Sequence, residues 1–434
     1  MIEVFQDFLS DETAFDMFIT GRAGTGKTTD MATLVKYCHD NNIGCVVSAY
    51  THKACGVLSS KLPDKTVITT LDSFLCKRPT IDQNAVDIKR LQNSTKVGDS
   101  KETQVLFVDE YSMVGEGDVA LMRTEQDPTY SGKPRMKVVW LGDPYQLPPV
   151  GAKPGITPAG KYQVLLTEIK RRAADNPLGK PIDMLVSFIE GEEPAALPEN
   201  ENFVRGQDIV ESYKAHDDAV ILAFTNQRVQ SLNASIQGRE QPESEDKLFC
   251  PTMQKTFVFK NWVDKPDMVT LPFGDPLVLG TKYRTLEYLH TMDDIRFAEV
   301  ETEEGDVVVM AVMFGHYNFK VALEYLKAEA AQTNRDIEQH KPGYKAAAWA
   351  KVHNTHSLAR KRAQAWREFL TFDECVVCMD FAHAMTVHKS QGSTFETVCV
   401  DTDDVYKAAQ FSFTNYLKLM YVALSRASKK VITN

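Results

Sequence analysis

The chain has 434 residues, which at roughly 150 residues per domain predicts two to four domains and excludes a single small binding module. Apolar residues make up 43% and charged residues 25%, a balance typical of a folded globular protein and not of a disordered one. The formal net charge is −10, from 59 acidic and 49 basic residues, which taken alone argues mildly against nucleic acid as a partner.

The sequence carries no signal for a membrane or for export. No run approaches the roughly 18 consecutive apolar residues of a membrane span, and the first segment, MIEVFQDFLSDE, is acidic where a secretory signal would be basic and then apolar. The eight cysteines are dispersed, so we expect reduced thiols and not a disulfide framework. We therefore expect a cytoplasmic protein without a membrane partner.

Short apolar runs that end in turn or acidic residues alternate with helical stretches, at 17–20, 45–49, 105–108, 137–141, 219–224 and 398–400. This rhythm predicts an α/β fold with doubly wound parallel sheets. It occurs twice, which predicts two tandem cores. We place the first core at 1–165 and the second at 166–275 together with 380–434.

Two segments interrupt the rhythm. Residues 77–103 are polar, contain no aromatic residue and predict a small insertion in the first core. Residues 276–379 begin with short strand-like runs and continue, from about 321 to 369, with helical ones. We expect this segment to form a small β-rich domain with a helical arm, inserted into the second core.

The first motif with a chemical meaning is GRAGTGKT at 21–28, which matches G-x-x-x-x-G-K-[ST] directly between an apolar run and a helical stretch. Such a phosphate loop turns backbone N–H groups towards phosphate oxygens. Its lysine, Lys27, is expected to reach the β- and γ-phosphates of a nucleotide, and Thr28 to hold Mg²⁺. The remaining expected nucleotide contacts come from Gly21, Ala23, Gly24, Thr25, Gly26 and Thr29.

A phosphate loop needs a carboxylate at the end of a neighbouring strand. The run VLFVDE supplies Asp109, placed for Mg²⁺, and Glu110, placed to orient and deprotonate the attacking water.

Several further strings resemble a known family. DEYSM (109–113), GDPYQLPPV (142–150), TVHKSQG (386–392) and YVALSRA (421–427) resemble motifs II, III, V and VI of superfamily 1 helicases. YTHKA (50–54), LTEIKR (166–171) and AFTN (223–226) are similar to the RecD-like branch, superfamily 1B, and most closely to the phage Dda helicase. The resemblance implies two RecA-like cores and an SH3-like β domain in the second insertion.

The resemblance also implies roles at the nucleotide. Gln146 resembles the motif III glutamine that senses the γ-phosphate, and an uncharged amide suits that task. Arg171 and Arg426 resemble the two arginines that reach the phosphate from the second core, where planar guanidinium groups stabilise the transferring phosphoryl group. Gln391 and Gly392 of motif V are expected to contact the nucleotide.

A track for single-stranded nucleic acid follows from the same resemblance. Hydroxyls and backbone amides hold phosphates without reading the base sequence, which suits a motor that must pass every base. The expected contacts belong to motifs Ia, Ib, IVa and V: Thr51, His52, Thr70, Ser73, Phe74, Thr225, Asn226, Thr386, His388, Lys389 and Ser390.

The function expected from these motifs is that of an ATP-dependent, Mg²⁺-dependent DNA helicase that moves 5′ to 3′ on single-stranded DNA. Expected partners are single-stranded and forked DNA and single-strand-binding or replication proteins. We expect a monomer, in the bacterial cytoplasm if the chain is phage-encoded. One alternative is a strand-binding switch that displaces proteins without processive unwinding, and a remoter one is a P-loop nucleotide kinase.

Three positions allow two interpretations. Phe74 fits the nucleic-acid track and the core equally well. Gln6 is the one glutamine available before the phosphate loop to contact adenine. Cys375 and Cys378, followed by His383 and His388, have partial zinc-site spacing, but a buried strand before motif V explains them better.

Two segments are also open. The insertion at 77–103 offers no aromatic residue to stack on a base pair, so duplex opening there would depend on exclusion by residues such as Ile88 or Leu91. Residues 341–367 hold seven basic and no acidic residues, interleaved with Tyr344, Trp349 and Trp366. They predict either a strand-binding surface or a solvated helical arm packed through its tryptophans. Local basic charge in an acidic chain would restrict DNA to a narrow track.

Overall fold

The computed structural model describes residues 1–50, 52–75, 77–79, 90–92, 104–125, 136–149, 151–168, 178–239, 241–251, 253, 255–264, 266–272, 277–278, 295–339 and 348–434. The chain forms two compact units. The first comprises Met1–Arg78, Gln92–Leu232 and Ala384–Asn434, and the second comprises Pro79–Leu91 and Asn233–His383.

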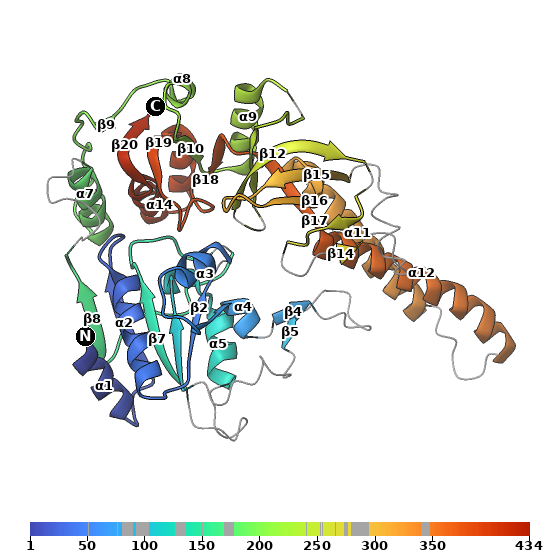
Figure 1. The fold of residues 1–434 in the computed structure, drawn as a ribbon, viewed down its shortest axis with the longest axis horizontal. Coiled ribbons are helices and arrows are strands. Elements are labelled where there is room, and N and C mark those ends of the chain that lie inside the picture. Colours follow the sequence, from blue (N-terminus) through green and yellow to red (C-terminus); the bar gives the residue numbers. More distant parts are fainter. Residues whose placement is uncertain are drawn as a thin grey trace. The chain divides into compact units, whose positions relative to one another are not determined.

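The first core is a six-stranded parallel sheet in the order β3-β2-β6-β7-β1-β8 (Figure 1). Its strands are nearly continuous apolar runs, as expected for a sheet covered on both faces. They are β1 (Asp16–Gly21), β2 (Cys45–Ala49), β3 (Val67–Thr70), β6 (Val105–Val108), β7 (Lys137–Gly142) and β8 (Tyr162–Leu166).

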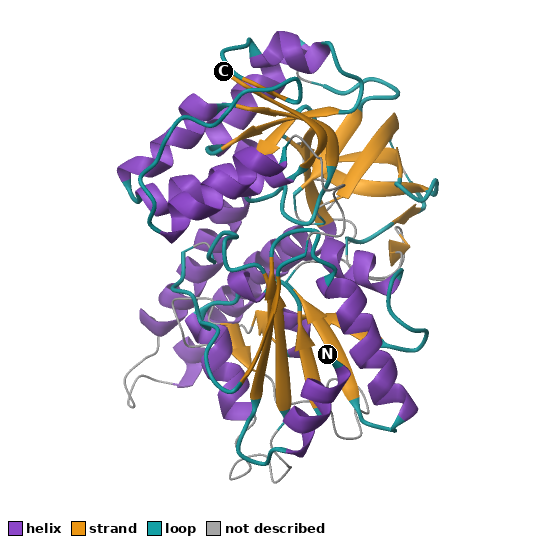
Figure 2. Ribbon diagram, turned by 90° about the vertical axis from the view of Figure 1, so that its left-hand side faces the viewer, coloured by secondary structure: helices purple, strands orange, loops and turns teal. Residues whose placement is uncertain are grey.

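Helices cover both faces of this sheet (Figure 2). One face packs against helices α1 (Ile2–Ser10), α2 (Lys27–Asp40) and α3 (His52–Ser59), through a cluster that includes Phe5 and Leu34. The other packs against α4 (Leu71–Phe74), the 3₁₀ turn η1 (Tyr111–Met113) and α5 (Glu116–Glu125), around Trp140. The two layers bury the central strands, whereas residues of the outer strands such as Val67 and Leu165 are exposed. The carboxyl ends of the strands form one edge of the sheet.

The second core is a five-stranded parallel sheet in the order β18-β10-β19-β20-β9. Its strands are β9 (Phe203–Val204), β10 (Ala219–Ala223), β18 (Ala384–Thr386), β19 (Phe395–Val400) and β20 (Ala427–Thr433). The accompanying helices are α7 (Gly179–Glu190), α8 (Ile209–Lys214), α9 (Asn226–Gln237), α13 (Thr402–Tyr406), η2 (Lys407–Gln410) and α14 (Phe413–Ser425). The prediction of two parallel α/β cores is confirmed.

Side-chain caps define where several of these helices begin. The Asp208 carboxylate accepts hydrogen bonds from the N–H groups of Val210 and Glu211 at the start of α8. Asp401 caps α13 through the N–H of Asp404, and Ser412 caps α14 through that of Asn415. Each cap satisfies amides that have no partner inside the helix.

The second unit contains a closed barrel of five strands: β11 (Lys247–Cys250), β12 (Lys255–Val263), β15 (Arg296–Glu301), β16 (Val307–Phe314) and β17 (Val376–Phe381). The predicted β-rich insertion is therefore present, but it starts earlier than residue 276. β11 and β12, which we assigned to the second core, are barrel strands because β11 pairs with both β12 and β17. A short antiparallel pair, β13 (Met268–Val269) and β14 (Leu277–Val278), lies between β12 and β15 in the sequence.

The helical arm consists of α11 (His316–Gln339) and α12 (Ala348–Cys375), which connect the parallel strands β16 and β17 (Figure 1). Trp366 of α12 is buried with Phe369, Phe372 and Leu326 in a cluster that also includes barrel residues. Its ring is therefore part of a core and not a free stacking surface for bases. Tyr344 lies outside the described residues, as does the side chain of Trp349.

In the first insertion, β4 (Lys77–Pro79) and β5 (Arg90–Gln92) form a two-stranded sheet. Ile88 and the side chain of Leu91 lie outside the described residues. In the part of the chain that the structure describes, no helix combines the length and the apolar character needed to cross a membrane.

Candidate active site

The phosphate loop connects the end of β1 to the start of α2, as its sequence predicts. Gly24 and Gly26 have φ values of +86° and +92°, a left-handed conformation that glycine adopts without strain. Lys27 Nζ donates to the carbonyl oxygens of Gly21 at 2.6 Å and Arg22 at 2.9 Å. The buried Thr25 hydroxyl also donates to Arg22 O, at 2.9 Å, which fixes the turn of the loop.

Asp109 and Glu110 follow directly after β6, at the same edge of the sheet as the loop. Burial, and then the Asp109 carboxylate, raise the pKa of Glu110 to about 7. Burial also raises the pKa of Asp109, against the positive charge of Lys27. Glu110 has a φ of +55°, which is uncommon outside glycine and turns its side chain out of the strand direction. Two half-buried carboxylates beside a lysine are a suitable environment for a cation.

Asp143 is a third carboxylate at this edge, and its place in the GDPYQLPPV string does not by itself indicate a role. It follows β7, which pairs in parallel with β6, so the two strands end side by side. It is fully buried, and it is the largest of the charges that raise the pKa of Lys27 against the lowering effect of burial. Gly142 before it must be a glycine because an added Cβ would lie 2.5 Å from the Tyr111 ring.

The second core contributes Arg426, at the end of α14. It is buried, and its guanidinium donates to Ser425 Oγ at 2.9 Å and to Val422 O at 3.2 Å. Its charge lowers the pKa of both Glu110 and Lys27, which places it in the electrostatic field of the first core's site. A Cβ added to Gly392 would lie 4.0 Å from Glu110 Oε1, so motif V also reaches this glutamate.

Within the described part of the chain, two buried glutamines have a polar atom without a hydrogen-bond partner: Gln146 Oε1 and Gln391 Nε2. A buried polar atom left in this way costs free energy, typically about 1–3 kcal/mol. Gln146 Oε1 is an acceptor, which suits a water, and Gln391 Nε2 is a donor, which suits a phosphate oxygen. With Thr28 half-buried at the start of α2, the residues fit a nucleotide with Mg²⁺.

Some expected site residues are not described. Arg171 and Thr51 lie outside the described residues. The backbone of His52 begins α3, and nothing is described of its side chain. Thr29 is exposed in the first turn of α2, where its N–H donates to Gly26 O.

In motif Ib, Thr70 caps α4: its hydroxyl accepts from Ser73 N–H at 3.2 Å and donates to Ser73 Oγ at 2.9 Å. Ser73 is exposed, whereas Thr70 is buried. Phe74 is half-buried and packs against the Trp140 cluster, which agrees with its interpretation as core. Ser73 is therefore the motif Ib side chain best placed for a ligand.

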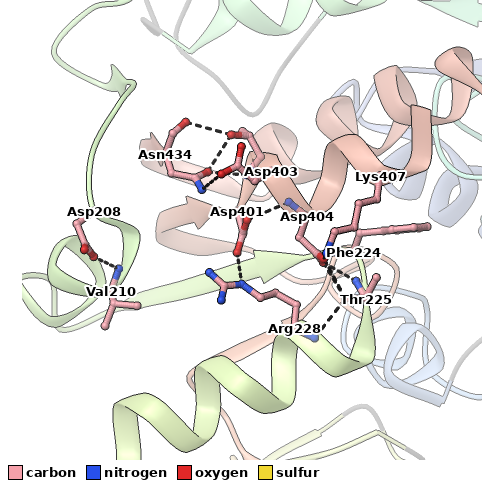
Figure 3. Close-up of polar contacts among 11 residues, drawn as sticks. Asp208, Val210, Phe224, Thr225, Arg228, Asp401, Asp403, Asp404, Lys407 and Asn434 are labelled. Atoms are coloured by element: carbon pink, nitrogen blue, oxygen red, sulfur yellow. Dashed lines mark hydrogen bonds and ion pairs between the residues drawn. The ribbon is translucent and has the colours of Figure 1, made fainter. Parts of the chain in front are cut away.

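In motif IVa, Thr225 belongs to a polar network around Asp404 (Figure 3). The Asp404 carboxylate accepts from Phe224 N–H at 2.8 Å, Thr225 N–H at 2.7 Å, the Thr225 hydroxyl at 3.0 Å and Lys407 Nζ at 2.7 Å. Although burial works in the other direction, these hydrogen bonds hold the pKa of Asp404 below its usual value. The Thr225 hydroxyl also accepts from Arg228 N–H and so caps α9, beside the exposed Asn226.

In motif V, Ser390 is fully buried and its hydroxyl donates to Val387 O at 2.8 Å, so its side chain holds the turn. Thr386 is buried and accepts from Lys389 N–H at 3.3 Å. His388 is half-buried, and burial lowers its pKa, which keeps the ring neutral near pH 7. Its ring lies 6.2 Å from that of Phe224, an aromatic neighbour that the sequence analysis did not single out.

The structure also places the remaining open positions. Gln6 is exposed on α1, where Nε2 donates to the Tyr37 hydroxyl at 3.2 Å, near the end of α2 that is distant from Lys27. Cys378 is buried in β17, as the strand interpretation predicts. Among the described residues, no group of three or more His, Cys, Asp or Glu side chains is arranged to hold a metal.

Known proteins resemble this chain in sequence and in fold. Residues 2–197 match the family described as AAA domain, and residues 381–433 match the UvrD-like helicase C-terminal domain. The Pif1 helicase from Candida albicans is 17% identical, with a TM-score of 0.53 over 100% of this chain and 92% of that one. The chain has the fold of the Pif1 helicases. The pair of matched domains is that of a DNA helicase and ATPase.

A second solved structure and one curated protein also match the chain. Bacteroides Pif1 bound to single-stranded DNA is 16% identical, with a TM-score of 0.51 over 99% of this chain and 91% of that one. The uncharacterized protein R530 of Acanthamoeba polyphaga mimivirus is 22% identical over 98% of this chain and 96% of its own length. The UvrD-like match contains Gln391, Gly392 and Arg426, so the second half of the candidate site lies within it.

Proposed function

We propose that this Pif1-like chain is an ATP-dependent helicase that translocates 5′ to 3′ along single-stranded DNA and belongs to the RecD-like branch near the Dda group. The observation that carries the proposal is the position of Arg426. A residue of the second core acts electrostatically on Glu110 and Lys27 of the first, so one site draws on both cores. Hydrolysis then depends on how the cores meet, which is the basis for coupling it to movement.

The roles of the residues follow from their chemistry. Lys27 binds the β- and γ-phosphates, Glu110 accepts the proton of the attacking water, and Gln146 contacts the γ-phosphate and that water. Arg426, with Arg171, stabilises the charge of the phosphoryl group in transfer. Thr28 and Asp109 would hold Mg²⁺, which supplies charge neutralisation at the phosphates. The raised pKa of Glu110 suits a base that works near neutral pH.

The nucleic-acid track is part of the same proposal. Ser73 and Asn226 are exposed, and His388 and Lys389 are half-buried, so these side chains are accessible for contact with a strand. Thr70, Thr225, Thr386 and Ser390 act instead by fixing the turns that present backbone amides. Support from relatives comes from a Bacteroides Pif1 structure, 15% identical with a TM-score of 0.50, that contains ADP-AlF3 and single-stranded DNA.

The proposal includes the setting of the enzyme. We propose a monomer in the cytoplasm that acts on single-stranded and forked DNA together with single-strand-binding or replication proteins. A structure titled for DNA unwinding at forked duplexes by two coordinating Pif1 helicases, 15% identical with a TM-score of 0.52, supports the forked substrate.

The deciding experiment is unwinding of forked duplexes that carry only a 5′ or only a 3′ single-stranded tail. The proposed function predicts ATP-dependent strand separation with the 5′ tail and little with the 3′ tail. The alternative, a strand-binding switch that displaces proteins, predicts ATP hydrolysis stimulated by DNA without separation of either duplex. Separation with the 3′ tail alone would reject the polarity.

Lys27→Ala tests the assignment of the site. We expect ATP hydrolysis to fall by about 10³-fold or more, because the charge at the transferring phosphates is removed. We expect the variant to stay folded, because the hydrogen bonds that Lys27 Nζ makes to described residues go to loop carbonyls and not to the core. Normal turnover by this variant would reject the site.

A further inference from the structure

Tyr421 of α14 meets the segment after β7 at the phosphate loop. Its hydroxyl donates a hydrogen bond of 2.6 Å to Asp143 Oδ2. The exposed fractions of Tyr421 and Asp143 are 1% and 0%, so water does not compete for this bond. Against burial and the Asp143 charge, which raise the pKa of Tyr421, the backbone of Ala23 in the phosphate loop lowers it. One side chain of the second core therefore interacts with two parts of the first core's site.

A second contact holds the same face of α14. Lys418 lies one turn before Tyr421, and its Nζ donates to Pro144 O at 3.1 Å. The Tyr421 ring packs edge-on against Tyr145, with centroids 5.9 Å apart. Burial and the Asp143 charge raise the pKa of Tyr421, which keeps its hydroxyl protonated and able to donate. Helix α14 is thus fixed to the 143–145 segment by the Tyr421 hydroxyl, the Lys418 ammonium group and the Tyr421 ring.

Arg426 is attached to the end of this same helix. Its guanidinium is bonded to Val422 O and Ser425 Oγ in the last turn, so a shift of α14 carries the guanidinium with it. An α-helix transmits such a shift rigidly over one or two turns. The contact at Tyr421 therefore determines where Arg426 lies relative to Glu110 and Lys27.

We propose that Tyr421, through its hydrogen bond to Asp143, is a positioning residue for ATP hydrolysis that sets the place of Arg426 at the phosphate loop. This inference rests on the proposed function because it takes Arg426 to act on ATP. Tyr421 itself transfers no proton and binds no phosphate in this role.

The test compares DNA-stimulated ATP hydrolysis by Tyr421→Phe, Asp143→Ala and the double variant. Each single variant removes the buried hydrogen bond between the two side chains, and we expect Tyr421→Phe to lower kcat about tenfold. KM for ATP should stay within about twofold in Tyr421→Phe, because this variant leaves the charges at the phosphate loop unchanged. The double variant should be no worse than the poorer single variant, since both remove the same interaction. Tyr162→Phe is the matched control: Tyr162 is buried, and its hydroxyl is 3.0 Å from Asp11 Oδ2, away from the site.

Repetition in an Arg426→Ala background separates positioning from general stability. There, Tyr421→Phe should change kcat by less than about twofold, because the residue it positions is gone. An unchanged kcat in Tyr421→Phe, or the same tenfold reduction without Arg426, would overturn the inference. Failure of the proposed function has a different signature, namely a wild-type protein that hydrolyses ATP but opens no forked duplex. A wild-type protein without ATP hydrolysis would reject both.

Discussion

Glu110 combines an unusual backbone conformation, a desolvated carboxyl and a raised pKa. Because the folded protein disfavours its ionised form, the contribution of Glu110 to stability is fully present below the unfolded pKa of 4.5. It is then lost as the pH rises through about 7. The cost at alkaline pH is on the order of 3 kcal/mol, at about 1.4 kcal/mol per pKa unit.

This pH dependence of stability gives a measurable difference between Glu110→Gln and the wild type. The variant has no carboxyl to ionise, so its free energy of unfolding should exceed that of the wild type increasingly as the pH rises from about 4.5 to 7. Denaturant unfolding at several pH values measures the difference. Glu116→Gln, at the exposed start of α5, is the control and should stay parallel to the wild type. Parallel curves for Glu110→Gln as well would contradict the assigned environment.

At the residue scale, the sequence predicts which residues lie at the site better than it predicts the role of each one. Strand-end carboxylates and a glycine-rich loop are local patterns, so Asp109, Glu110 and Lys27 could be found from spacing. The hydroxyls of Thr70, Thr225 and Ser390 could not be assigned in this way. Near the start of a helix, a Ser or Thr hydroxyl can either cap backbone amides or bind phosphate. Only the hydrogen-bond partners in the structure distinguish the two roles.

At the element scale, the carboxylate of Asp404 connects α13 to the turn between β10 and α9 (Figure 3). An ion pair between Arg228 of α9 and Asp401, the cap of α13, joins the same region. The network fixes the motif IVa turn from a segment that lies about 180 residues later in the chain. Such an interaction is invisible to local sequence patterns.

We expect Asp404→Asn to destabilise the protein by about 2 kcal/mol, because an amide has one acceptor atom where the carboxylate oxygens bind several donors. Affinity for single-stranded DNA should fall as well if the turn contacts the strand. Chemical denaturation and fluorescence anisotropy measure the two effects. Asp403→Asn is the neighbouring control: Asp403 is exposed, and the change should be under about 0.5 kcal/mol. Equal effects of the two variants would show that the network is unimportant.

The barrel shows that a local sequence pattern can predict a strand without predicting the sheet that the strand joins. Apolar runs in 247–263 predict strands but not their sheet, because β17, which completes the barrel, follows more than 100 residues later. The parallel cores could be predicted since each strand and its helix repeat a local unit. Barrel closure is a long-range pairing, so the boundary at residue 276 was placed too late.

At the scale of the whole molecule, the question is whether the net charge of −10 confines DNA to a narrow track. Arg360, Lys361 and Arg362 of α12 are exposed or half-buried and lie in the basic run. If they bind phosphates, changing all three to Gln should make log K fall less steeply with log salt, by about 0.7 for each phosphate that is no longer neutralised.

Lys320, Lys327 and Arg335 of the neighbouring helix α11 provide a control with the same change in charge. Their replacement by Gln should leave the salt slope unchanged, as measured by equilibrium titration of a labelled oligonucleotide. If both triple variants keep the wild-type slope, α12 is a solvated arm without a role in strand binding.

Strand β10 has a consequence for how the chain is made. It pairs only with β18 and β19 in the described part of the protein, and these follow about 160 residues later. At roughly 5–20 residues per second, a ribosome needs about 10 to 30 s to deliver those partners. The first core can fold in that interval. Val220, Ile221 and Leu222, which are buried in the folded protein, have no strand partner until β18 and β19 are synthesised. The nascent chain is therefore most in need of a chaperone between the synthesis of β10 and that of β19.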